Sequence, residues 1–207
     1  MTRLVIGGPT LATVPASFAV DLAQLCATTA GSGVWGSLTL GYIGATYVHV
    51  GREAFLEGAL ERQASHVLWL DSDMAFPPDT AIRLAKHNRP IVACNCVMKH
   101  PRQIFTAVRD GQRIATRDDS TGLETVDWVG LAVMLMRTDI LADLPRPWFR
   151  HEVDPATGED VGEDVWFCRS LRAAGHAIEI DHDVSKDIGH VGYHTYRAIT
   201  REAVAAS

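Results

Sequence analysis

The residues best suited to chemistry lie in three short segments, of which the first is Asp71-Ser72-Asp73, directly after the apolar run 67–70. Two carboxylates after a buried strand could hold Mg²⁺ or Mn²⁺ against a diphosphate, because hard cations prefer oxygen ligands and a diphosphate needs its charge neutralised. Alternation along an extended segment would place both Asp side chains on the same side. The alternative is a turn or a helix cap, since Asp favours both positions.

The second segment is Glu163-Asp164, which we expect to open a helix. A carboxylate at this place could act as a general base that removes the proton of an attacking hydroxyl group. An aromatic neighbour such as Trp166 would shield the carboxylate and increase its basicity. The alternative is a structural role, because carboxylates in a first helical turn complement the helix dipole.

The third segment, Gly189–Gly192, contains His190. His190 could join Asp73 in a metal site that includes one imidazole. A rival site would pair His190 with His194, four residues later, to bind zinc on a helix, although a glycine between them weakens that helix. A structural, hydrogen-bonded histidine is the third alternative.

The sequence has the composition of a folded protein. It disfavours a membrane-spanning or secreted protein and a general nucleic-acid binder. The chain has 207 residues, of which 47% are hydrophobic and 21% are charged, so one domain with a packed core is expected. No apolar run reaches the ~20 residues that span a bilayer, and the N-terminus lacks the pattern of a signal peptide. A cytoplasmic location is therefore expected, in the host cytoplasm if the protein is viral. The formal net charge of -6 disfavours a general grip on nucleic-acid backbones.

Two further groups of residues, the cysteines and a basic stretch, can be explained without a functional role. The four cysteines lack the spacing of a zinc knuckle and are expected to be buried, reduced thiols. A basic stretch in the middle of the chain could form a local patch or simply a solvated surface. Its members are Lys99, His100, Arg102, Arg109, Arg113 and Arg117.

The first ~95 residues alternate between strands and helices. Expected strands lie at 4–6, 34–42, 67–70 and 91–93, and expected helices at 16–29, 48–64 and about 77–88. This alternation predicts a Rossmann-like α/β fold with a mixed, mainly parallel sheet and helices on both faces. The rest should contain β-structure over 103–129, a strand at 133–136, a long loop over 145–162 and a helix over 163–174 that is capped by Gly175.

One motif is misleading. The segment Gly31–Gly36 matches the G-x-G-x-x-G fingerprint of dinucleotide-binding proteins. That fingerprint requires a strand before it and a helix after it, so that the helix N-terminus meets the pyrophosphate. Here a helix precedes and a strand follows, so we predict a turn.

Together these segments resemble the GT-A glycosyltransferases, especially the small single-domain forms encoded by bacteriophages. The resemblance extends from about residue 4 to about residue 192. It implies one GT-A-like catalytic domain over 1–207, with a nucleotide-binding half over about 1–95 and an acceptor half over about 96–207. The matching motifs are Val67–Met74, Phe76-Pro77-Pro78, Ile91–Ala93, Trp128-Val129-Gly130, Gly162–Cys168 and Gly189–Gly192.

On the donor side, the resemblance implies a Mn²⁺ or Mg²⁺ ion bound directly by Asp73 and by His190. Asp71 would lie near the ribose and a metal-bound water molecule, with Ser72 between the two acidic residues.

The nucleotide itself would meet three further residues. Arg52 matches the basic residue on the helix before the acidic motif, and Pro9 and Thr10 fall where the base is usually held. The family often has Asn after that Arg, whereas this chain has Glu53.

On the acceptor side, the resemblance assigns Asp164 as the base of an inverting transfer. Glu163 would assist it or bind the acceptor. Trp128 and Gly130 match the acceptor-side strand, and Trp166 belongs to the motif that carries the base.

The sequence thus predicts a metal-dependent glycosyltransferase that moves a sugar from a nucleotide-sugar, most consistently a UDP-sugar, to an acceptor hydroxyl group with inversion. A glycan and a modified DNA base are the acceptors considered. One alternative is a nucleotidyltransferase acting on a sugar phosphate, but the segment 7–10 lacks the basic residues that would hold a triphosphate. The other is a non-catalytic nucleotide-sugar binder, which the combination of all three segments disfavours.

Overall fold

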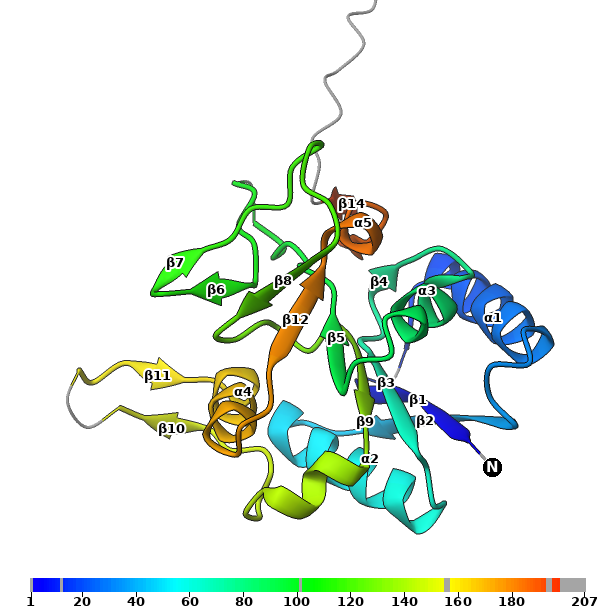
Figure 1. Cartoon of the computed structure of the whole chain (residues 1–207), viewed down its shortest axis with the longest axis horizontal. Helices are drawn as coiled ribbons and strands as arrows, with labels where there is room; N and C mark the ends of the chain where they lie inside the picture. The colour runs from blue at the N-terminus through cyan, green and yellow to red at the C-terminus, as the bar shows by residue number, and fades with distance from the viewer. Residues whose placement is uncertain (1, 12, 101, 155–156, 193–194, 198–207) are drawn as a thin grey trace, which may run out of the picture.

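A seven-stranded sheet forms the centre of the molecule (Figure 1). The computed structural model describes residues 2–11, 13–100, 102–154, 157–192 and 195–197. The strands follow the order β2-β1-β3-β9-β5-β12-β8, and all but β9 and β8 run in the same direction. Their bounds are β1 (Arg3–Thr10), β2 (Ser37–Gly44), β3 (His66–Leu70), β5 (Ile91–Ala93), β8 (Leu123–Val126), β9 (Val133–Arg137) and β12 (Ile178–Asp181).

Helices cover both faces of this sheet because β3 is apolar on both of its sides. Val67 and Trp69 pack in one core cluster, with the helices α2 (Val48–Glu61) and α4 (Glu163–Ala173). Leu68 and Leu70 pack in the other cluster, with the helices α1 (Ala16–Gly31) and α3 (Thr80–Lys86). The predicted α/β fold, with a mixed and mainly parallel sheet between two layers of helices, is therefore confirmed.

The second half of the chain contains shorter elements. The 145–162 segment, which was expected to be a loop, contains a hairpin of β10 (Glu152–Val153) and β11 (Asp160–Val161). Strand β12 was not predicted at all. Further short elements are the hairpin of β6 (Val108–Arg109) and β7 (Gln112–Arg113), the 3₁₀ helix η1 (Asp139–Asp143) and the short helix α5 (His182–Ser185).

A separate three-stranded sheet joins distant parts of the chain, and it was not predicted from the sequence. It consists of β4 (Met74–Ala75), β13 (Gly189–Val191) and β14 (Thr195–Arg197). The pairing of β13 with β4 places His190 opposite Met74. His190 is thereby brought beside the acidic motif that precedes β4.

Three smaller predictions can also be compared with the structure. The predicted turn is confirmed, because α1 ends at Gly31 and β2 begins only at Ser37. All four cysteines are free thiols; three are buried and Cys26 is partly exposed. Among the helices of the described residues, none has the length and apolar character required to cross a membrane.

Candidate active site

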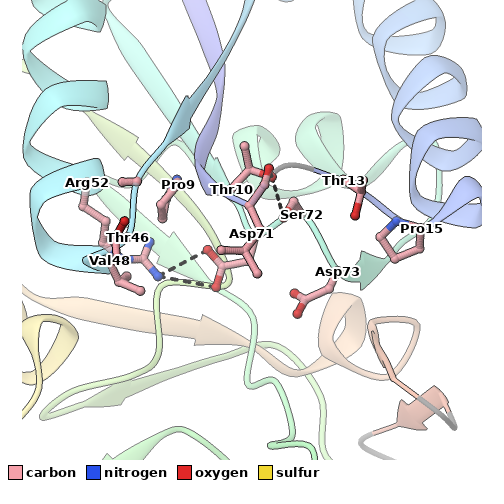
Figure 2. A pocket seen from close by; sticks show the side chains of 12 residues that line it. Pro9, Thr10, Thr13, Pro15, Thr46, Val48, Arg52, Asp71, Ser72 and Asp73 are labelled. Carbon is pink, nitrogen blue, oxygen red and sulfur yellow. Dashed lines mark hydrogen bonds and ion pairs between the residues drawn. The ribbon is translucent and has the colours of Figure 1, made fainter.

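A pocket of about 330 Å³ opens where β1 and β3 end (Figure 2). The carboxyl ends of neighbouring parallel strands meet at this edge of the sheet, which is where α/β proteins bind ligands. All six residues predicted to bind the donor line this one pocket: Pro9, Thr10, Arg52, Asp71, Ser72 and Asp73. The sequence reasoning missed the rest of the lining, which is Leu11, Thr13, Pro15, Ala45, Thr46 and Val48.

Arg52 is a buried bridge between two acidic residues. Its Nη2 donates to Asp71 Oδ1 at 3.2 Å, and its Nε donates to Glu163 Oε1 at 3.2 Å. Its Nη1 is buried and has no hydrogen-bond partner within the described part of the chain. Since buried donors are normally paired, this nitrogen is an unsatisfied donor on a side chain that lines the pocket.

Gly51 allows α2 to approach the pocket closely. A Cβ atom at this position would lie 2.8 Å from Ala45 Cβ and 2.9 Å from Pro9 Cβ. Only a glycine therefore fits where the helix that carries Arg52 touches the pocket wall.

The acidic motif forms a turn, so the extended geometry predicted for it is wrong. Met74 N donates to Asp71 O at 3.2 Å, which closes the turn. Asp71 consequently faces Arg52, while Asp73 faces the other end of the pocket (Figure 2). Thr10 Oγ1 donates to Ser72 Oγ at 3.1 Å and fastens the turn to the end of β1.

Asp73 contacts an imidazole and an ammonium group. His190 Nε2 lies 3.4 Å from Asp73 Oδ1, and Lys99 Nζ donates to Asp73 Oδ2. His190 Nδ1 donates to Val97 O at 2.9 Å, so Nε2 donates to the carboxylate in the imidazolium form and presents a lone pair to it in the neutral form. Burial would raise the pKa of Asp73, but hydrogen bonds from His190 and Lys99 outweigh it and hold the pKa at about 2.

The predicted three-residue metal site is not assembled. Within the described residues, no group of three or more His, Cys, Asp or Glu side chains is arranged to hold a metal ion. Asp71 is paired with Arg52, which leaves Asp73 and His190 as neighbours. A carboxylate that faces an imidazole lone pair is a suitable partial donor set for Mn²⁺ or Mg²⁺.

The rival zinc pair on a helix is wrong in its geometry, because His190 lies in strand β13. His194 lies outside the described residues.

Asp164 lies in the first turn of α4, as predicted. Its Oδ1 accepts a hydrogen bond from Val165 N at 2.7 Å. Burial, followed by the nearby charge of Glu163, raises the pKa of Asp164 above its usual value. Glu163 itself is paired with Arg52. Of the two neighbouring carboxylates, Asp164 is therefore the one free to accept a proton.

The residues predicted to bind the acceptor lie in α4 and in the segment between β8 and β9. Cys168 Sγ donates to Val129 O at 3.5 Å, which joins these two segments. The guanidinium carbon of Arg113 lies 5.7 Å from the centre of the Trp128 ring, and that of Arg150 lies 4.8 Å from the centre of the Trp166 ring.

Gly130 and Glu53 have structural roles. A Cβ atom at Gly130 would lie 3.2 Å from Thr106 Cβ, so this glycine permits close packing. Glu53, where the family often has Asn, accepts from Phe149 N at 3.0 Å and also pairs with Arg146. Glu53 thus fastens the segment before the β10–β11 hairpin to α2.

Comparisons with known proteins agree with the fold. No protein-family model matches the chain. The chain is similar to the crystal structure of A197 from STIV, with a TM-score of 0.60 and 18% identity over 98% of this chain and 100% of that one. It also resembles residues 1–349 of S. aureus TarS, solved with UDP-GlcNAc, with a TM-score of 0.49 and 15% identity over 88% of this chain and 56% of that one.

A curated relative is the mannan polymerase complex subunit mnn9 of Schizosaccharomyces pombe, which is 31% identical over 99 residues. The match covers 45% of this chain and only 26% of that protein. The likeness to A197 extends over almost the whole of both chains, so the two chains share a fold.

Proposed function

We propose that this protein is a metal-dependent glycosyltransferase that transfers a sugar from a UDP-sugar to an acceptor hydroxyl group with inversion. The observation that carries the proposal is the pocket at the carboxyl edge of the sheet. It is lined by Arg52, whose Nη1 has no partner among the described residues, and by Asp73, which is contacted by His190. The GT-A-like fold and the partial similarity to a mannan polymerase subunit support it.

The pocket divides into parts that suit the parts of a nucleotide-sugar. We place the base against Pro9 and Thr10, at the end of β1. Asp73 and His190 would hold Mn²⁺ or Mg²⁺, which supplies positive charge for the departing diphosphate. Arg52 Nη1 would donate to a phosphate or sugar oxygen, which satisfies a buried donor that otherwise has no partner among the described residues.

Asp164 is the proposed base. It takes the proton of the acceptor hydroxyl, whose oxygen forms a bond to the anomeric carbon while the bond from that carbon to the diphosphate oxygen breaks. The electron pair leaves with the diphosphate, and attack from the opposite face inverts the anomeric centre. The raised pKa of Asp164 suits this task, because a base works best with a pKa close to the working pH. Glu163 stays paired with Arg52 and keeps the start of α4 beside the pocket.

The acceptor would bind near Trp128 and Trp166. One face of each ring is covered by an arginine, so the opposite face would be offered to a sugar or a base. A glycan and a modified DNA base are the two acceptor classes to be tried, in a single catalytic domain over 1–207 that acts in the cytoplasm.

The proposal is tested by incubating the protein with nucleotide-sugars, Mn²⁺ and each acceptor class. We expect UDP release and an inverted product; pyrophosphate release would indicate a nucleotidyltransferase, and binding without turnover a non-catalytic binder. Asp164→Asn should leave UDP affinity within a few-fold but lower transfer by about 10²–10⁴, the usual contribution of a general base. Asp110→Asn, at an exposed carboxylate, is the control. Near-normal transfer by Asp164→Asn, or a product with retained configuration, would overturn the assigned mechanism.

A further inference from the structure

Lys99 contacts Asp73, and the backbone of the segment that carries Lys99 is held by hydrogen bonds. Val97 forms a bridge with Phe105, and Met98 N donates to Ile104 O at 2.8 Å. The bond from His190 Nδ1 to Val97 O fastens the same segment to β13. The backbone beside Lys99 is therefore held in place, whereas its side chain is 38% exposed and ends on Asp73 Oδ2.

A metal ion bound at Asp73 would weaken the contact between Lys99 and Asp73. The other oxygen of this carboxylate already faces His190, so an ion bound there would lie close to the ammonium group. Like charges at that distance repel each other strongly in a partly buried site. Asp71 is a weaker alternative partner for the ammonium group, because Arg52 already neutralises its charge.

A displaced ammonium group would find its nearest new partner on the donor itself. The diphosphate would lie beside the metal, and its oxygens accept hydrogen bonds from ammonium groups. The lysine side chain is a flexible four-carbon stem with three rotatable donors, so a change of rotamer suffices.

We propose that Lys99 is a second cation of the donor site. It neutralises Asp73 while the pocket is empty, and it moves to the diphosphate oxygens of the donor when the metal takes the carboxylate. This inference rests on the proposed function. It assigns two opposite effects to Lys99. The side chain lowers the affinity for the metal ion alone and increases the affinity for the nucleoside diphosphate in the presence of the metal.

Two calorimetric titrations test both effects, one with Mn²⁺ alone and one with UDP in saturating Mn²⁺. Compared with the wild type, Lys99→Met should bind Mn²⁺ alone about tenfold more tightly and UDP about tenfold more weakly, since one charge-assisted hydrogen bond is exchanged in each case. Lys99→Arg should bind UDP nearly as the wild type does, because a guanidinium group also binds phosphate. Lys86→Met, at an exposed position at the end of α3, controls for the lost charge.

The outcomes separate this inference from the function on which it rests. If the wild type binds UDP in a metal-dependent way but Lys99→Met binds Mn²⁺ no more tightly, or UDP no more weakly, the role of Lys99 is overturned and the function stands. If the wild type shows no metal-dependent UDP binding, both are overturned. A circular-dichroism melt verifies the fold of each variant, and Lys99→Gln replaces Lys99→Met if the latter does not fold.

Discussion

Two charged clusters border the same pocket, one through Arg52 and Asp71 and the other through Asp73, but they differ in construction. In the Arg52 cluster, a guanidinium side chain that is only 5% exposed lies 3.2 Å from Asp71 and 3.2 Å from Glu163. In the Asp73 cluster, the carboxylate is 35% exposed, His190 lies 3.4 Å from it, and Lys99 contacts it from a flexible side chain.

The difference in burial indicates that the two clusters have different roles. A buried ion pair is costly to break, because it leaves an uncompensated charge. A half-exposed pair is worth little and exchanges partners readily. We therefore expect the Arg52 cluster to fix the shape of the pocket and the Asp73 cluster to exchange its cations when the donor binds.

The largest expected effect comes from breaking the fixed cluster. Arg52→Ala removes the shared partner of two carboxylates, so the free energy of unfolding should fall by about 3–5 kcal/mol. Arg137→Ala is the matched control, because its ion pair with Asp139 lies on the surface and should be worth about 0–1 kcal/mol. Chemical denaturation measures both. Equal losses in the two variants would show that the Arg52 cluster is no more structural than a surface pair.

The next effect concerns binding rather than folding. Asp73→Ala should leave the protein folded but make its affinity for UDP the same with and without Mn²⁺, because the carboxylate that attracts the ion is gone. Isothermal titration calorimetry gives both affinities, with Asp110→Ala as a control at an exposed carboxylate. An affinity for UDP that still increases with Mn²⁺ in Asp73→Ala would contradict the metal assignment.

His190→Ala should have a smaller effect in the same assay. One ligand of several is lost, so we expect about tenfold weaker UDP binding in Mn²⁺ with metal dependence retained. A wild-type protein that unfolds when a zinc chelator is added would instead indicate a structural zinc site.

Much of the fixed cluster could be predicted from the sequence, because long periodic elements carry its residues. The strand before Asp71 and the helix that begins at Glu163 were both predicted correctly. Their hydrogen-bonded contact with Arg52, which joins positions 111 residues apart, could not be predicted, since no local pattern encodes it.

The exchangeable cluster was harder to predict. His190 reaches Asp73 through the pairing of β13 with β4, and strands of two or three residues have no measurable periodicity. Lys99 was visible only as a member of a basic stretch. Its contact depends on how the 97–105 segment closes, which is a tertiary effect.

The smallest expected effect is a change in the pH dependence of stability when Asp164, the proposed base, is replaced. Burial, then the charge of Glu163, raises the pKa of Asp164 above the ordinary value of about 3.9, so ionisation is harder in the folded state than in the unfolded state. The contribution of Asp164 to stability is therefore fully present below the unfolded pKa and is lost as the pH rises through the raised folded pKa. Asn cannot ionise, so Asp164→Asn should gain stability relative to the wild type between about pH 4 and about pH 7.

Asp183 provides a control of opposite sign. The backbone N–H of Gly122 donates to Asp183 Oδ2 at 2.9 Å and is the main cause that lowers the pKa of this carboxyl. Its contribution is present above the unfolded pKa and is lost as the pH falls through the lowered folded pKa. Asp183→Asn should therefore be less stable than the wild type by a nearly constant amount between about pH 4 and about pH 7, and this deficit should shrink only at lower pH. Urea unfolding at both pH values gives the two differences. If both variants were less stable than the wild type, or both more stable, Asp164 would not be the destabilised carboxylate that a general base requires. Removing the charge should stabilise the protein where burial disfavours that charge, as at Asp164, and destabilise it where a hydrogen bond favours the charge, as at Asp183.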